Sequence, residues 1–323
     1  MKIEKQKLII RIGGRASLLS RIQMHEVSLY LCKKYPFIKT EFYFIKTKGD
    51  TNNLLPISHM SNIGVFTENV NKALKFNKID IAVHSYKDLP WGIGYNIRIP
   101  CILDRKYSSD AIISKLSNTL NTLPNNATIG TSSIRRKSAL LYYQPNFNIV
   151  PIRGNLGTRI NKMLNIKNKI KTIILSFIGI KKIKLNKNFI GINKIRSNDF
   201  ISAPSQGAMV IQCKNNYKYS YLIKKINNYK ATIETLIERS FLRILGGTCC
   251  IPIAASANFI NNRLIFKGQI FSPNGKNKIQ IFNINKIYYI DQLRFINNAY
   301  SIGAIAAKSA ILYGTNSVIK YYL

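Results

Sequence analysis

The chain has 323 residues, of which 46% are hydrophobic, so it is long enough for two or three domains that each bury a core. Its 49 lysines and arginines against 13 acidic residues give a formal net charge of +36, which suits a polyanionic partner but also fits compositional drift, because the lysines gather on no single helix or tail. The five cysteines are irregularly spaced, which argues against a disulfide framework, and the three histidines are scattered, which argues against a zinc site. No apolar run approaches the ~20 residues of a membrane span. With no apparent export signal, these features predict a cytoplasmic protein.

Strand-like and helix-like segments alternate over the first hundred residues. Apolar runs rich in isoleucine, phenylalanine and tyrosine predict strands, and the longer segments between them are typical of helices. This alternation predicts βαβ units and a mostly parallel sheet. The predicted strands are 7–12, 41–47 and 79–83, and the predicted helices are 17–34 and 66–76.

The same pattern resumes near residue 110 and predicts a second α/β domain over about 105–200. A lysine- and asparagine-rich stretch, 181–198, is predicted to be a long loop or a poorly ordered connection. An apolar strand at 207–213 is placed to return to the first sheet. The predicted strands of the second domain are 111–113, 128–129, 148–150 and 172–175.

The remaining chain predicts a smaller region of mixed character. A long helix-like segment, 231–245, leads into the run Gly246-Gly247-Thr248-Cys249-Cys250-Ile251-Pro252. Alternating apolar residues then predict strands at 264–271 and 278–284, and a last helix is predicted at 291–312.

Four of the 14 arginines lie within 25 residues, in two glycine-bounded turns, Gly130 to Arg136 and Arg153 to Arg159. A guanidinium matches a carboxylate or phosphate at two points. Each turn also precedes a helix-like stretch, whose N-terminus favours anions. The window therefore predicts a site for a small ligand with several negative charges, and the alternative is a solvated charged face.

Three further motifs could carry chemistry: Gly14-Arg15-Ala16-Ser17, the run from His84 to Pro90, and the Gly246 to Pro252 run. The first two follow predicted strand ends, where open α/β sheets bind ligands. Asp88 is a carboxylate among many arginines, so it should stay ionised and could stabilise a cation or deliver a proton. Its alternative role is to cap a turn before Pro90.

The two cysteines of the third motif are alternative covalent attachment points. The preceding glycines would let a loop carry either Cys249 or Cys250 into a cleft. The alternative is a small buried hydrophobic side chain, which is the usual place of a free cysteine.

Taken together, the motifs resemble the porphobilinogen deaminase (hydroxymethylbilane synthase) family of tetrapyrrole biosynthesis. They occur in the family's order and cover most of the chain, which makes seven individually weak matches specific. The matching segments are Arg15-Ala16-Ser17, Lys48-Gly49-Asp50, Asp80 to Pro90, Gly130 to Arg136, Arg153 to Arg159, Ser205 to Ala208, and Gly247 to Pro252.

The resemblance implies an α/β fold of three domains. The first two would be similar to type II periplasmic binding proteins around a central cleft, and the third a small α+β domain with a three-stranded antiparallel sheet. It implies hinges near 103–108 and 198–203. The implied boundaries are 1–103 with 203–222 for domain 1, 108–199 for domain 2, and 229–323 for domain 3.

The resemblance also implies a transferase that condenses four porphobilinogen molecules head to tail onto a covalent dipyrromethane, with loss of ammonia, and then releases a linear tetrapyrrole. Cys249, which precedes a residue, an aliphatic and a proline, would carry the cofactor through a thioether. Asp88 would be catalytic, and no metal is implied. The implied carboxylate-binding residues are Arg15, Ser17, Lys87, Thr131, Ser133, Arg135, Arg136, Arg153, Arg159 and Gln206.

Some positions depart from the family's pattern. His59 and Ile63, in the loop 56–64, stand where lysines are usual, Lys182 stands where an arginine is common, and Leu18 replaces a frequent proline. We expect a cytoplasmic monomer with porphobilinogen as partner and no nucleic-acid or membrane partner. Two alternatives are a non-catalytic binding protein for a small polyanion, against which Cys249 in its motif argues, and a nucleic-acid-binding protein, which the net charge of +36 favours.

Overall fold

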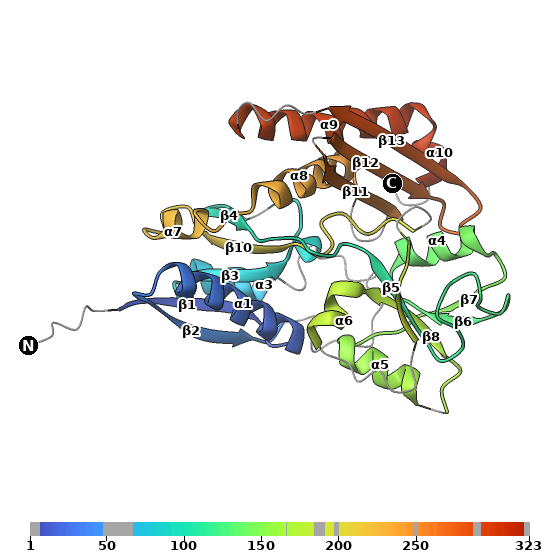
Figure 1. Cartoon of the computed structure of the whole chain (residues 1–323), viewed down its shortest axis with the longest axis horizontal. Coiled ribbons are helices and arrows are strands. Elements are labelled where there is room, and N and C mark those ends of the chain that lie inside the picture. Colours follow the sequence, from blue (N-terminus) through green and yellow to red (C-terminus); the bar gives the residue numbers. More distant parts are fainter. Residues whose placement is uncertain are drawn as a thin grey trace, which may run out of the picture. The chain divides into compact units, whose positions relative to one another are not determined.

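The computed structural model divides the chain into two compact units (Figure 1). Unit 1 comprises Met1–Arg105 and Ala208–Thr232, and unit 2 comprises Lys106–Gly207 and Ile233–Leu323. The structure describes residues 7–47, 67–92, 94–165, 167–183, 191–196, 200–247, 251–261, 263–286 and 292–319.

Unit 1 is built on a five-stranded sheet in the order β2-β1-β3-β10-β4. β1 pairs in parallel with β2 and β3, whereas β10 runs antiparallel to both β3 and β4. β10 alone runs against the other four strands, so the sheet is mostly parallel, as expected, with one antiparallel strand. Its strands are β1 (Leu8–Arg15), β2 (Ile38–Ile45), β3 (Ile81–Ser85), β4 (Ile97–Ile102) and β10 (Met209–Lys214).

Antiparallel β10 has a simple origin. A strand that follows its neighbour through a βαβ crossover must run parallel to it. β10 instead follows the first segment of unit 2, Lys106–Gly207, so no βαβ crossover within its own sheet fixes its direction. The predicted strand 207–213 does return to the first sheet, as β10.

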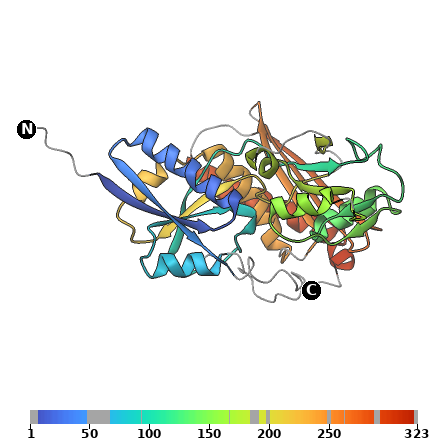
Figure 2. The same ribbon diagram turned by 90° about the horizontal axis from the view of Figure 1, so that it is seen from below.

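Helices cover both faces of the unit 1 sheet, as Figure 2 shows for α1 (Leu18–Lys34) and α3 (Glu68–Lys75). Met24 and Leu31 of α1 pack in one core cluster with Ile12 of β1. Residues of α3 pack in another cluster with Ala82 of β3. Burial on both faces explains why these strands read as nearly continuous apolar runs. Two short helices, η2 (Tyr86–Asp88) and α7 (Ser220–Lys224), complete the unit.

Unit 2 contains a second five-stranded sheet, in the order β7-β6-β8-β5-β9. β7, β6 and β8 pair in parallel, while β5 is antiparallel to both β8 and β9. α4 packs in the cluster on one face, and α5 and α6 in the cluster on the other. The elements are β5 (Asp110–Ser114), β6 (Thr128–Gly130), α4 (Ile134–Tyr143), β7 (Asn148–Val150), α5 (Leu156–Leu164), β8 (Thr172–Ser176), α6 (Phe177–Ile183) and β9 (Gly191–Lys194).

The prediction of a long loop over 181–198 was wrong in part. α6 continues to Ile183, and β9 forms an edge strand against β5. Lysine and asparagine are poor strand formers, so composition hides this strand. Pairing with an apolar neighbour supplies the stability that its own sequence lacks.

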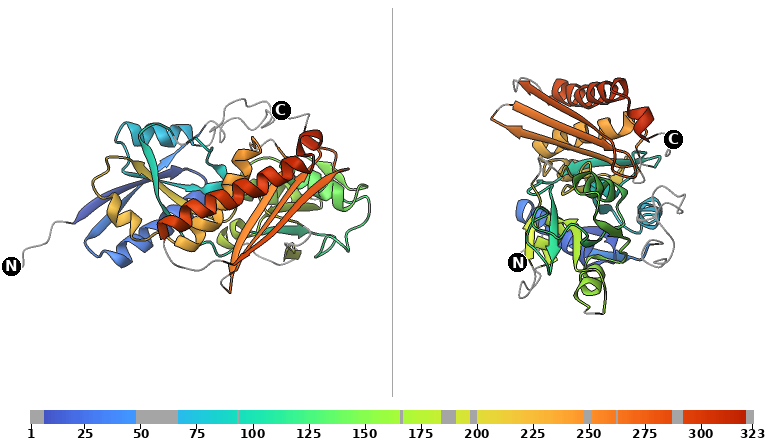
Figure 3. Two further views of the ribbon diagram at one scale, coloured as in Figure 1. Left: turned by 90° about the horizontal axis from the view of Figure 1, so that it is seen from above. Right: turned by 90° about the vertical axis from the view of Figure 1, so that its right-hand side faces the viewer.

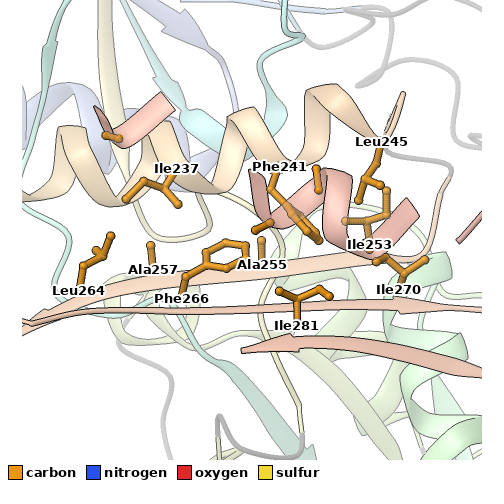
Figure 4. Packing of buried hydrophobic residues seen from close by; sticks show 14 of the residues in the cluster. Ile237, Phe241, Leu245, Ile253, Ala255, Ala257, Leu264, Phe266, Ile270 and Ile281 are labelled. Carbon is orange, nitrogen blue, oxygen red and sulfur yellow. The ribbon is translucent and has the colours of Figure 1, made fainter. Parts of the chain in front are cut away.

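A three-stranded antiparallel sheet, β11-β12-β13, forms the rest of unit 2. The long helix α9 runs across it in Figure 3, and Figure 4 shows its core against α8. Phe241 of α8 and Phe266 of β12 meet edge to face, with ring centroids 5.1 Å apart. The elements are α8 (Tyr229–Ile244), β11 (Ile253–Ile260), β12 (Arg263–Phe271), β13 (Lys278–Lys286), α9 (Gln292–Leu312) and α10 (Thr315–Ile319).

The expected fold class is confirmed. The structure has two five-stranded α/β sheets of mixed strand direction and a separate three-stranded antiparallel sheet that carries helices. Like β9, the strands β4 and β11 were not predicted from the sequence. The three predicted domain ranges remain predictions. Within the described ranges, no helix combines the length and apolarity that a membrane crossing requires.

Candidate active site

Unit 1 brings two of the predicted motifs to one edge of its sheet. β1 and β3 are parallel neighbours, so they end on the same side. Arg15 is the last residue of β1, and Ser17 caps the N-terminus of α1, its hydroxyl accepting a hydrogen bond from the backbone N–H of Ser20 at 3.4 Å. The turn η2 follows β3 directly and carries Lys87 and Asp88. The expectation that these motifs lie at carboxyl ends of strands is thus confirmed.

A cavity of about 60 Å³ lies at this edge. Three predicted site residues, Arg15, Ser17 and Asp88, line it together. Lys87 is half-buried beside Asp88, whose side chain is exposed. A cation, a hydroxyl and a carboxylate therefore share a space about large enough for one substituent of a small ligand.

Neutral polar groups complete the lining of this cavity. Gln23, on the buried side of α1, donates from Nε2 to the Ser85 hydroxyl at 3.0 Å. His84 is only 5% exposed. Burial first, and then the charge of Arg15, lower the pKa of His84 from 6.5 to about 4. At neutral pH the imidazole is therefore uncharged beside Arg15.

Unit 2 places its two arginine turns at one edge of the second sheet. The turns follow β6 and β7, which are adjacent parallel strands. The backbone N–H of Thr131 donates to the Val150 carbonyl at 2.9 Å, which ties the two strand ends together. Ser133 is the N-cap residue of α4, and its own N–H donates to the Thr131 hydroxyl at 3.3 Å. Both hydroxyl side chains thus lie at the beginning of α4.

Arg135 and Arg136 point inward from the first turn of α4 and bind Asp110. Arg135 Nη2 lies 2.6 Å from Asp110 Oδ2, and Arg136 Nη2 lies 2.7 Å from Oδ1. Both arginines are less than 10% exposed, and Asp110 is fully buried. The interpretation of these two residues as a solvated charged face was therefore wrong.

Gln206 belongs to the same cluster. Its Nε2 donates to Asp110 Oδ1 at 2.9 Å and to the Ser108 carbonyl at 2.8 Å. Burial alone would raise the pKa of Asp110, but the charges of Arg135 and Arg136 and the hydrogen bonds outweigh it and hold that pKa well below its ordinary value. Asp110 therefore stays ionised throughout the neutral range.

The second arginine turn is fixed by its own backbone. Gly154 has a φ of +110°, a conformation that a side chain would strain. Asn155 caps α5, accepting from the Thr158 N–H at 2.9 Å. Arg159 Nε donates to the Gly154 carbonyl at 2.8 Å. Arg153 and Arg159 are both half-buried, so the turn holds two guanidiniums near the surface.

Several predicted features lie outside the described residues. Cys249 and Cys250 are among them, as are the Lys48-Gly49-Asp50 motif and the loop 56–64 with His59 and Ile63. Among the residues that the structure does describe, no three His, Cys, Asp or Glu side chains are grouped as metal ligands would be.

Three residues at these sites were not predicted from the sequence: Asp110, Gln23 and His84. Asp110 had a signal, because it is one of seven aspartates and opens an otherwise apolar strand. A charged residue at the buried end of such a strand requires a partner. Gln23 stands beside buried Met24 on α1, and its burial could not be read from periodicity. His84 was quoted within its motif without a role of its own.

Comparison with known proteins places the chain in one family. The family model described as "Porphobilinogen deaminase, dipyromethane cofactor binding domain" matches residues 10–220, and the model of the porphobilinogen deaminase C-terminal domain matches residues 232–310.

Curated relatives agree over most of their length. A porphobilinogen deaminase from Wolbachia sp. is 35% identical over 297 residues, 92% of this chain and 96% of the relative. That of Ehrlichia canis is 37% identical over 264 residues, 81% and 87%. That of Chloroherpeton thalassium is 32% identical over 314 residues, 97% of each. This chain belongs to the porphobilinogen deaminase family.

Proposed function

We propose that the chain is a porphobilinogen deaminase, a transferase that condenses four porphobilinogen molecules head to tail with loss of ammonia and then releases the linear tetrapyrrole by hydrolysis. Family membership supports this reaction. The unit 1 cavity links this reaction to particular residues, because Arg15, Ser17 and Asp88 line the same small space.

Carboxylates are the groups that these sites suit. Porphobilinogen carries an acetate and a propionate, and each added ring brings two more. In unit 1, Arg15, Ser17 and Lys87 would hold such groups through charge-assisted hydrogen bonds. In unit 2 the same role falls to residues around the two turns. These are Thr131, Ser133, Arg135, Arg136, Arg153, Arg159 and Gln206.

The residues of unit 2 also fit the dipyrromethane cofactor, which itself bears four carboxylates. Two buried guanidiniums share the single carboxylate of Asp110, so the three side chains carry one positive charge in excess. Arg135 Nε is buried with no hydrogen-bond partner among the described residues. When bound, the cofactor supplies the pyrrole ring to which the first substrate is added. We propose Cys249 as its thioether attachment.

Asp88 is placed to act on a developing positive charge. The pyrrole nitrogen becomes cationic as ammonia leaves, and a preorganised carboxylate stabilises such a charge. Asp88 lines the cavity with Arg15, so a substrate anchored there by a carboxylate would present its ring to Asp88. The Asp88 carboxylate would also take up a proton from the ring at the end of each addition.

We further propose that the protein acts as a monomer in the cytoplasm, with porphobilinogen as its partner and with neither nucleic acid nor membrane as a target. The even spread of lysine supports drift as the source of the net charge of +36. Gel filtration tests whether the protein is a monomer, and a salt titration of nucleic-acid binding tests whether nucleic acid is a target. Tight nucleic-acid binding that is lost steeply with added salt would contradict the proposal that it is not.

The mass of the intact purified protein tests the reaction and the attachment residue together. We expect an excess equal to two pyrrole units, which grows in steps on addition of porphobilinogen. Cys249→Ser should abolish the excess, and Cys250→Ser, its matched neighbour, should keep it. Loss of the excess in Cys250→Ser alone would reassign the attachment, and absence of any excess in the wild type would refute the proposed function.

The role of Asp88 is tested by Asp88→Ala. We expect this variant to retain the two-pyrrole mass excess and to lose turnover, measured by chromatography of the tetrapyrrole product. Glu41→Ala removes an exposed carboxylate of β2 in the same unit and serves as the control. Near-normal rates in Asp88→Ala would remove Asp88 from catalysis.

A further inference from the structure

The charges of the Asp110 cluster of unit 2 do not sum to zero. The cluster is defined as Asp110, Arg135, Arg136 and Gln206. Two guanidiniums and one carboxylate leave an excess of one positive charge, and all four side chains are less than 10% exposed. Burying uncompensated charge is costly, so such clusters normally contain a matching counter-ion. Within these four described side chains, one positive charge has no matching anion.

The hydrogen bonds show where that anion would bind. Arg136 is saturated on its inner side, since Nη2 and Nε both donate to Asp110 Oδ1, at 2.7 Å and 3.2 Å, and Nη1 donates to the Ile174 carbonyl at 3.0 Å. Arg135 uses Nη2 on Asp110 and Nη1 on the Ile201 carbonyl at 2.7 Å. Its buried Nε has no hydrogen-bond partner among the described residues. The open donor of the cluster is therefore on Arg135.

The same cluster reaches two of the three places where the chain passes between unit 1 and unit 2. The chain crosses at residues 105/106, 207/208 and 232/233, and the cluster contacts the segments beside the first two. Gln206 Nε2 donates to the Ser108 carbonyl at 2.8 Å, on the first segment. Arg135 Nη1 donates to the Ile201 carbonyl, on the second. Asp110 thus lies at the junction of the arginine pair with the two connections.

We propose that Asp110 is a positioning residue of the deaminase: it fixes Arg135 and Arg136 with one uncompensated positive charge for a ligand carboxylate, and it links occupancy of that site to the segments 106–110 and 200–207. The inference rests on the proposed function. It adds a role for Asp110 and Gln206 that acts through the arginines, because Asp110 is enclosed by them and need not touch the ligand.

Gln206→Glu tests the charge argument most sharply. The change is close to isosteric and gives the cluster a second carboxylate, but it also puts an acceptor oxygen in place of the Nε2 that donates to Asp110 Oδ1 and to the Ser108 carbonyl. If the excess charge serves a ligand, the folded variant should have a lowered melting temperature and a KM for porphobilinogen raised about tenfold to a hundredfold, the range of one lost charge-assisted hydrogen bond. A folded Gln206→Glu variant with wild-type KM would overturn the proposal.

Asn125→Asp is the matched control, since it makes the same charge change at an exposed position of unit 2 and should leave KM as in the wild type. An equal rise of KM in this control would assign the effect to general electrostatics and overturn the proposal. Asp110→Asn should both raise KM and lower the melting temperature, because it leaves two buried guanidiniums without an anion. Retention of wild-type KM in a folded Asp110→Asn variant would also contradict the inference.

Hydrogen exchange provides a measurement that does not depend on turnover. In the wild-type holoprotein, porphobilinogen should slow amide exchange within 106–110 and 200–207, and in Gln206→Glu this protection should be lost while the mass excess from the covalent cofactor remains. Unchanged exchange in the wild type with substrate bound would remove the link to the connecting segments. A wild type without the mass excess would instead refute the proposed function, so the two failures are distinguishable.

Discussion

His84 should make the stability of unit 1 depend on pH in a defined window. The folded unit holds the pKa of this buried imidazole near 4, against an ordinary value of 6.5. Between these two values the unfolded chain binds a proton that the folded unit does not. Stability therefore rises with pH, is complete above about pH 6.5 and is lost as the pH falls towards 4.

The magnitude follows from the difference between the two pKa values. A difference of this size is worth about 3 kcal/mol over the whole window. Lowering the pH from 7 to 5 should remove about 2 kcal/mol of it. Asp110 does not interfere, because its pKa is held well below its ordinary value and it does not titrate in this range.

Hydrogen exchange of the β3 and β10 amides is the appropriate assay, since it reports the opening of unit 1 rather than the unfolding of the whole chain. The informative quantity is the difference between wild type and His84→Gln. Between pH 7 and pH 5, the free energy of opening measured by exchange should fall by about 2 kcal/mol less in the variant than in the wild type. His25→Gln is the matched control, because His25 is an exposed residue of α1 whose ring lies tilted against that of Phe42, with centroids 4.3 Å apart.

Equal pH slopes in wild type and His84→Gln would refute the reasoning. Such a result would mean that the imidazole is not kept neutral by its burial beside Arg15. If the pH dependence disappeared in His25→Gln instead, His25 rather than His84 would be its cause.

Three further predictions concern unit 2. Phe241→Ala should cost about 3–5 kcal/mol in denaturant unfolding, because Phe241 is fully buried against Phe266, and a loss below about 1 kcal/mol would mean that the site collapses around the cavity. Gly207→Ala should lower the melting temperature and the yield of folded protein, since φ is +92° and an added Cβ would lie 2.0 Å from the Tyr107 carbonyl oxygen, and wild-type stability would contradict that geometry. Asn155→Ala should cost about 1 kcal/mol by removing the cap of α5, whereas Asn155→Asp should preserve the cap and the stability.

Much of the fold could be predicted because strong local patterns mark it. Short apolar runs predicted β3 and β6 to within a few residues, and the two arginine turns were expected just before helices, where α4 and α5 begin. β9 was missed because its stability comes from its neighbour β5 rather than from its own residues. The direction of β10 could not be predicted, because it depends on where the chain re-enters the sheet, which no local window contains.

Part of the candidate site could likewise be predicted from the sequence, and part could not. Arg15, Ser17 and Asp88 were predicted together from motifs at strand ends, and they line one cavity. That Arg135 and Arg136 would turn inward could not be predicted, because the turn sequence is the same whether they face water or Asp110. The pairing is 25 residues apart in the chain and becomes visible only in three dimensions.

The position of β10 has a consequence for biosynthesis of the protein. The N-terminal sheet needs residues 209–214 between β3 and β4, so its middle stays open while more than one hundred intervening residues leave the ribosome. Until then two strands expose backbone groups that could pair with another nascent chain. Translation speed through the second sheet should therefore influence how much of the product aggregates, and a chaperone that shields strand edges would act at this stage.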